Sequence, residues 1–120
     1  MKPLNRDIHI LEHIVSYCQQ IEDTVARFGN DGSIFSSDPI YRNAAALCIL
    51  QIGELVGKLS EEFRSQHSSI PWRQIKAMRN IVAHSYGTVD PETTWEIIQY
   101  DIPKLKEYCV SLLDAPAEIT

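Results

Sequence analysis

The chain has 120 residues, of which 44% are hydrophobic and 22% are charged, and its formal net charge is −5. This composition is typical of a single globular domain, and it excludes disordered and fibrous proteins as well as a general nucleic-acid coat held by positive charge. No segment approaches the roughly 18 apolar residues that span a bilayer, and the first residues carry no secretory signal, so we expect a cytoplasmic protein.

Two long helices are predicted in the first half of the chain. Apolar residues recur every three or four positions over residues 5–28, and residues 29–32, "GNDG", contain glycines of the kind that end helices. Asp38 then offers a cap, and Pro39 a favourable first residue, for a second helix that we expect to reach Arg64. The small residues of this helix predict close contact with another helix, within the bundle or in a second copy of the chain: Ala44, Ala45, Ala46, Gly53 and Gly57.

Two further helices are predicted in the second half. The third begins near Pro71 and ends at Gly87, and the fourth covers residues 91–112. Pro103 removes a backbone donor inside the fourth helix and predicts a kink near residues 99–102.

No segment alternates with the period of a β-strand, and the loops are short. We therefore expect an all-α protein, an antiparallel bundle of four main helices, formed by a single domain over residues 1–114 and followed by a loose tail at residues 115–120.

The charge of the chain is unevenly distributed. The window from Arg64 to Val89 has four Lys or Arg and no Asp or Glu, so it carries +4 while the rest of the chain carries −9. An acidic protein with one basic region is suited to bind a polyanion locally and repel it elsewhere.

At 100° per residue, Arg79 falls inside the apolar arc of the third helix, between Trp72 and Ile75. A charged guanidinium there needs a partner, and Glu54 is a candidate. The neighbouring arc of the same helix is polar and consists of Arg73, Lys76, Asn80 and His84.

Arg79 and His84 are five residues apart, so they diverge by about 140° in a continuous helix. They converge on one ligand only if the helix loosens before His84, if a two-fold axis joins two subunits, or if the arginine curls around. Otherwise Arg79 pairs with a carboxylate such as Glu54, and His84 caps a helix end.

These residue types suit RNA cleavage without a metal. When the neighbouring 2′-hydroxyl is the nucleophile, the reaction needs a proton acceptor and donor near neutral pH and a cation on the phosphate. In such a reaction His84 would have the first property and Arg79 the second, and Asn80 would hold the substrate or orient the histidine. We expect Arg73 and Lys76 to guide the RNA backbone.

A second motif has the spacing of a zinc site but does not predict one. "HILEH", with His9 and His13, matches the H-x-x-E-H spelling of one class of zinc peptidase, but no pattern for a third ligand follows, so we expect two exposed histidines.

The chain has three cysteines, an odd number without a CxxC spacing: Cys18, Cys48 and Cys109. We expect them to be reduced, buried thiols. We predict no metal and no cofactor.

The stretch "RNIVAHSY", Arg79 to Tyr86, carries an R-x4-H-x-Y motif and resembles the HepT-like toxins, a branch of the HEPN superfamily. The similarity extends in the same order to "AALCILQIGELVGKLS" (45–60), "PWRQIKAMRN" (71–80) and "VDPETTWEIIQYDIPKLKE" (89–107), so that the matching stretches run from residue 45 to residue 107.

The resemblance implies a HEPN-like homodimer with both motifs along a shared cleft, and a metal-independent endoribonuclease toxin paired with a minimal nucleotidyltransferase antitoxin. By position, Arg79 and His84 would be catalytic, with Asn80 at the polar position after the arginine, and Tyr86 would be the tyrosine to which the antitoxin attaches AMP. The alternative is a non-catalytic helical subunit that binds a nucleotide or the nucleotidyltransferase itself.

Overall fold

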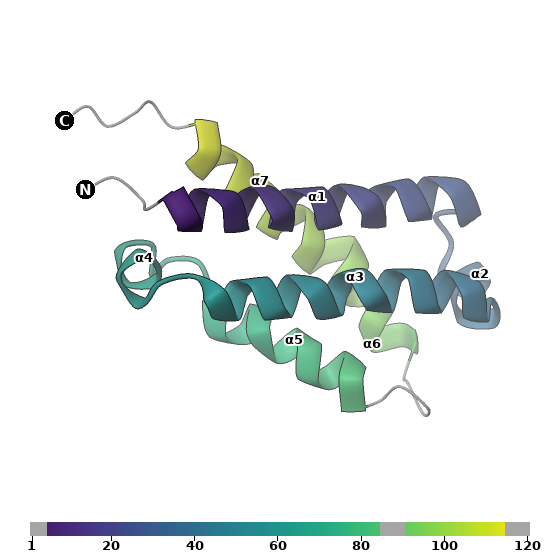
Figure 1. Cartoon of the computed structure of the whole chain (residues 1–120). Coiled ribbons are helices and arrows are strands. Elements are labelled where there is room, and N and C mark those ends of the chain that lie inside the picture. Colours follow the sequence, from purple (N-terminus) through teal and green to yellow (C-terminus); the bar gives the residue numbers. More distant parts are fainter. Residues whose placement is uncertain (1–4, 85–90, 115–120) are drawn as a thin grey trace.

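The computed structural model describes the backbone of residues 5–84 and 91–114, and the side chains of residues 6–80 and 91–114. Every regular element in these ranges is helical (Figure 1): α1 (Asn5–Phe28), α2 (Gly32–Ser37), α3 (Pro39–Lys58), α4 (Glu61–Gln66), α5 (Trp72–His84), α6 (Pro91–Glu96), the π-helical turn η1 (Ile97–Asp101) and α7 (Ile102–Asp114). None of these helices combines the length and apolarity that a membrane crossing requires. The expectation of an all-helical protein is confirmed for this part of the chain, whereas the expected tail at 115–120 lies outside it.

The two long helices, α1 and α3, lie side by side and run in opposite directions (Figure 1). α1 ends where expected, because Gly29 adopts a φ of 121° while its amide still donates to the carbonyl of Val25. The side chain of Asp38 accepts hydrogen bonds from the amides of Ile40 and Tyr41, which confirms the predicted cap of α3.

The structure has a short helix, α2, between the two long ones, where the sequence predicts no helix. Asp31 caps it by accepting a hydrogen bond from the Ser33 amide at 2.8 Å, and the hydrogen bonds from Ser33 lower the pKa of the Asp31 carboxyl. Phe35 is fully buried and meets the ring of Tyr41 edge to face, with centroids 4.9 Å apart. A six-residue helix is too short to show a helical period, so its formation depends on this contact.

The expectation that the second helix reaches Arg64 is wrong. α3 ends at Lys58, and Ser60 begins the separate helix α4 by accepting a hydrogen bond from the Phe63 amide. Ser60 is held there by Asp7 of α1, which is 1% exposed and accepts from both the Ser60 amide and its hydroxyl at 2.9 Å. A buried carboxylate needs such donors, so this pair fixes the break.

α5 packs against α3 at the two glycines of the second predicted helix. A Cβ atom at Gly53 would lie 2.5 Å from the Cβ of Arg79, and one at Gly57 would lie 3.3 Å from Cε of Lys76. The predicted close helix contact is therefore confirmed within the bundle, and Gly53 sets how closely α5 approaches.

The predicted kink before Pro103 takes the form of the π-helical turn η1, in which the amide of Ile102 donates to the carbonyl of Ile97, five residues back. The wider turn accommodates a proline ring that would collide with the carbonyl of Gln99 in a regular α-helix. α7 then crosses α1 diagonally (Figure 1), and Lys106 of α7 pairs with Glu22 of α1 at 3.0 Å.

The core lies between α1, α3, α5 and α7, and it includes the three cysteines as free, buried thiols, as expected. Burial raises the pKa of Cys18 and of Cys109 to about 12, and raises that of Cys48 as well. These thiols serve as small apolar side chains.

Candidate functional site: the basic face of α5

Three predicted site residues share one exposed face of α5. Arg73, Lys76 and Asn80 are all exposed, and at 100° per residue they lie within an arc of about 60°. The buried side of the same helix carries Trp72, Ile75 and Met78, as the hydrophobic pattern predicted. The amphipathic pattern therefore directs the cations to the surface while the apolar arc holds α5 on the core.

Arg79 lies at the edge between these two faces. Its side chain is 40% exposed, and its Nε lies 3.2 Å from Oε2 of Glu54, so the partner considered from the sequence is the one found. Glu54 is 51% exposed, so this ion pair is not buried, and water weakens it.

The arginine is only partly satisfied by these contacts. Its buried Nε has no hydrogen-bond partner among the described residues, so the pair with Glu54 is a charge contact without an aligned hydrogen bond. One terminal nitrogen donates to Oδ1 of Asn80 at 3.3 Å, a long hydrogen bond. The neighbouring motif residues Arg79 and Asn80 are thus hydrogen-bonded to each other, and the half-buried guanidinium keeps donor capacity at its terminal nitrogens.

α5 continues as a regular α-helix to His84. The alternative in which the helix loosens before His84 is therefore not what the structure has, and the divergence of about 140° between the two backbone positions remains. The side chain of His84 and all of Tyr86 lie outside the described residues, so their predicted roles stay predictions.

A groove of about 500 Å³ lies between α4 and the first half of α5, and it extends the basic face. It is lined by Glu61, Arg64, Ser65, Trp72, Arg73 and Lys76. No ion pair joins Arg64, Arg73 or Lys76 to a carboxylate in the part of the chain that the structure describes. Arg64 belonged to the acid-free window of the sequence but had been given no role of its own.

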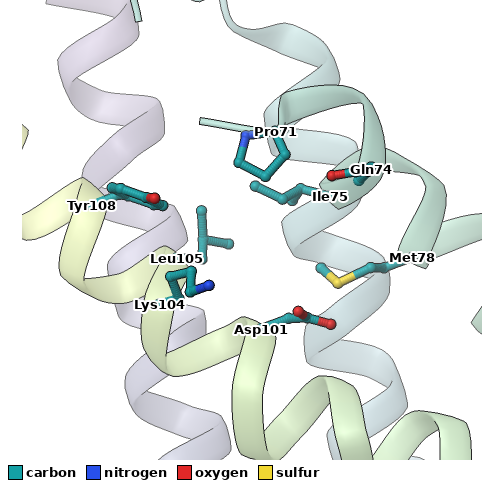
Figure 2. A pocket seen from close by; sticks show the side chains of 8 residues that line it. All are labelled: Pro71, Gln74, Ile75, Met78, Asp101, Lys104, Leu105 and Tyr108. Carbon is teal, nitrogen blue, oxygen red and sulfur yellow. The ribbon is translucent and has the colours of Figure 1, made fainter. Parts of the chain in front are cut away.

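A second cavity, of about 350 Å³, lies on the other side of α5, facing α7 (Figure 2). Figure 2 shows Gln74, Ile75 and Met78 of α5 opposite Lys104 and Tyr108 of α7. Its walls are largely aliphatic and aromatic, and its one cation is accompanied by Asp101. The lining therefore carries no net positive charge that would favour a phosphate, because it contains one cation and one carboxylate.

The histidines of the HILEH stretch project from α1 into solvent. His9 lies 3.3 Å from Glu12 in an exposed contact, and His13 is also exposed. Within residues 5–84 and 91–114, no group of three His, Cys, Asp or Glu side chains is arranged to hold a metal ion.

Comparison with known proteins gives a consistent result. The family model described as "Ribonuclease HepT-like" matches residues 11–112. "Putative RNase TTE0752" of Caldanaerobacter subterraneus is 35% identical over 86% of this chain and 90% of its own length. "Putative RNase MJ0125" of Methanocaldococcus jannaschii is 32% identical over 85% of this chain and 87% of its own length. "Probable ribonuclease HepT" of Thermococcus cleftensis is 38% identical over 46% of this chain and 50% of its own length.

No solved structure matches the chain significantly. The family match nevertheless includes most of α1, all of α3, the groove and the complete R-x4-H-x-Y stretch. The resemblance drawn from the residues is therefore confirmed: this chain belongs to the ribonuclease HepT-like family of the HEPN group.

Proposed function

We propose that this protein is a metal-independent endoribonuclease, and that it acts as the toxin of a toxin–antitoxin pair. The observation that carries the proposal is the hydrogen bond between Arg79 and Asn80 at the edge of the exposed face of α5, where Arg73 and Lys76 have no carboxylate partner among the described residues. The chain also belongs to a ribonuclease HepT-like family. A partly exposed guanidinium beside cations that lack a carboxylate partner in the described part of the chain suits an RNA phosphate better than a neutral ligand.

In this proposal the 2′-hydroxyl of one nucleotide attacks the adjacent phosphorus. The bond from phosphorus to the 5′-oxygen breaks, leaving a 2′,3′-cyclic phosphate on one fragment and a 5′-hydroxyl on the other. His84 transfers one of the two protons, either the one that leaves the 2′-hydroxyl or the one that reaches the departing 5′-oxygen, and water transfers the other. Arg79 stabilises the charge that develops on the phosphate, Asn80 orients it, and Arg73 and Lys76 hold the flanking backbone.

A homodimer brings the diverging motif residues together in this proposal. Ile40 and Leu47 are 68% and 58% exposed, although both are aliphatic. Together with Glu54 they recur every seven residues, and so share one face of α3. Because Glu54 contacts Arg79, two copies joined along this face would bring their arginines near a common axis. The histidine of each subunit then complements the arginine of the other.

The dimer is tested by measuring molar mass in solution by light scattering. Leu47→Glu should shift the protein to a monomer, because it adds a charge at the proposed contact. Ile34→Glu, at an exposed aliphatic residue of α2, is the control and should leave the dimer intact. A wild-type monomer at micromolar concentration contradicts this part of the proposal.

Inhibition follows from charge in the same proposal. A minimal nucleotidyltransferase attaches AMP to Tyr86, and the added phosphate repels RNA next to Arg79. Incubation with the cognate nucleotidyltransferase and ATP should add AMP to the peptide that contains Tyr86, as seen by mass spectrometry. An unmodified Tyr86 peptide, or modification that leaves RNA cleavage unchanged, contradicts this step.

The activity is tested by cleavage of a labelled single-stranded RNA in the presence of EDTA. We expect wild-type protein to release fragments with cyclic phosphate ends, and His84→Ala and Arg79→Ala to lose at least about 100-fold in rate. Arg27→Ala, which removes an exposed arginine at the far end of α1, is the matched control. Cleavage by His84→Ala at the wild-type rate refutes the assignment, and loss of activity in EDTA refutes the metal-independent mechanism.

One observation favours the alternative of a non-catalytic subunit, because Arg79 is already paired with Glu54. Growth inhibition on expression separates the two functions. If Arg79→Ala abolishes toxicity while folding and binding of the nucleotidyltransferase are unchanged, the enzyme is supported. If the wild-type protein is not toxic and Arg79→Ala weakens binding of the nucleotidyltransferase, the binding subunit is supported instead.

A further inference from the structure

We infer that the groove between α4 and α5 is a second phosphate-binding subsite, which holds the RNA strand beyond the cleavage position and in which Arg64 is the third cation. This inference rests on the proposed ribonuclease function for the identity of the polyanion. The groove itself is defined by Arg64 and Ser65 on α4 and by Arg73 and Lys76 on α5.

The position of Arg64 depends on the break after α3. Because Ser60 starts a new helix, Arg64 lies in its last turn and lines the groove together with Arg73 and Lys76. Figure 1 shows α4 folded at the end of α3, beside the start of α5. Cations from two helices therefore line one groove instead of pointing to separate parts of the surface.

Both ends of α4 are held in place before any ligand binds. At its start, the buried carboxylate of Asp7 binds Ser60 through two hydrogen bonds. At its end, the indole nitrogen of Trp72 donates to the carbonyl of His67 at 3.1 Å, and the ring of Phe63 packs against that of His67 at 4.5 Å. A rigid wall reduces the loss of side-chain and loop freedom on binding.

The charge of the groove favours a phosphate chain. Its three cations have no carboxylate partner in the described part of the chain, and the one acidic residue among the lining side chains, Glu61, is exposed. The rest of the sequence is strongly acidic, so an RNA strand is repelled from most other surfaces.

The groove is also continuous with the proposed cleavage site. Arg73, Lys76 and Asn80 share a face of α5, and Arg73 lies about 10 Å from Asn80 along the helix axis. A strand that reaches Asn80 and Arg79 therefore continues past Lys76 and Arg73 to Arg64. The subsite should contribute binding of flanking nucleotides and no chemistry.

The test uses protein carrying His84→Ala, so that RNA stays intact, and measures the Kd of a fluorescent single-stranded RNA at several salt concentrations. Arg64→Gln should weaken binding about fivefold, the equivalent of one exposed ion pair, and should reduce the slope of log K against log salt by about 0.7. Arg27→Gln removes the same charge from α1 and should change neither value. Glu61→Gln should tighten binding by a factor of about two to five.

The outcomes separate this inference from the proposed function. In the active protein, Arg64→Gln should raise KM for a long RNA and leave kcat unchanged, and a dinucleotide substrate should be unaffected. If wild-type protein cleaves RNA but Arg64→Gln behaves like Arg27→Gln, the subsite is refuted and the ribonuclease stands. If RNA is bound with the expected dependence on Arg64 but never cleaved, the subsite stands and the ribonuclease is refuted. If RNA is not bound at all, both are refuted.

Discussion

Replacing Gly53 with alanine should destabilise the protein, although alanine is the better helix former. The new Cβ would lie 2.5 Å from the Cβ of Arg79, whereas carbon atoms in contact are separated by about 3.5–4.0 Å. The obstacle is next to the backbone, so α5 must move by about 1 Å. Overpacking of this kind lowers the unfolding free energy by about 1–3 kcal/mol, and the higher helix propensity of alanine offsets about 0.5–1 kcal/mol of that loss. We expect Gly53→Ala to lose about 1–2 kcal/mol of unfolding free energy.

Gly57→Ala is the matched control, one helical turn further along α3. Its Cβ would lie 3.3 Å from Cε of Lys76, the far end of a flexible side chain that can rotate away. Gly57→Ala should therefore gain about 0.5–1 kcal/mol. Urea unfolding followed by circular dichroism measures both values. The reasoning about α3 and α5 is refuted if Gly53→Ala is as stable as Gly57→Ala.

Three further predictions concern buried groups. Asp7→Ala removes both hydrogen bonds to Ser60 and should lower the unfolding free energy, measured in urea, by about 2–4 kcal/mol. Asp23→Ala, the control, removes an exposed carboxylate that accepts a hydrogen bond from Gln19 and should change the unfolding free energy by less than about 0.5 kcal/mol. Equal effects of the two substitutions would contradict the role of Asp7. Burial raises the pKa of Cys18 and Cys109 from 9.0 to about 12, so the unfolded chain releases these protons first and stability should fall as the pH rises from about 9 towards 12. The same thiols should react with a maleimide at pH 8 only as fast as the protein unfolds, and rapid labelling of the folded protein would contradict their burial.

The sequence by itself determined the features that depend on neighbouring residues. Helical periodicity predicted α1, α3 and the buried arc of α5, and local chemistry predicted the end of α1 at Gly29, the cap at Asp38 and the kink before Pro103. The acid-free window predicted a basic surface, and Glu54 was considered as the partner of Arg79. These signals lie within one or two helical turns of the residues concerned, or are a property of composition.

The tertiary structure decided the features that join distant residues. The break that creates α4 depends on a hydrogen bond between Asp7 and Ser60, which are 53 positions apart. α2 depends on the burial of Phe35, and Gly53 acquires its importance from Arg79 on another helix. Arg64 becomes part of a groove only because that break redirects it towards α5. Sequence periodicity assigns each helix its buried face, but the geometry of a site that spans two helices is set by the packing between them.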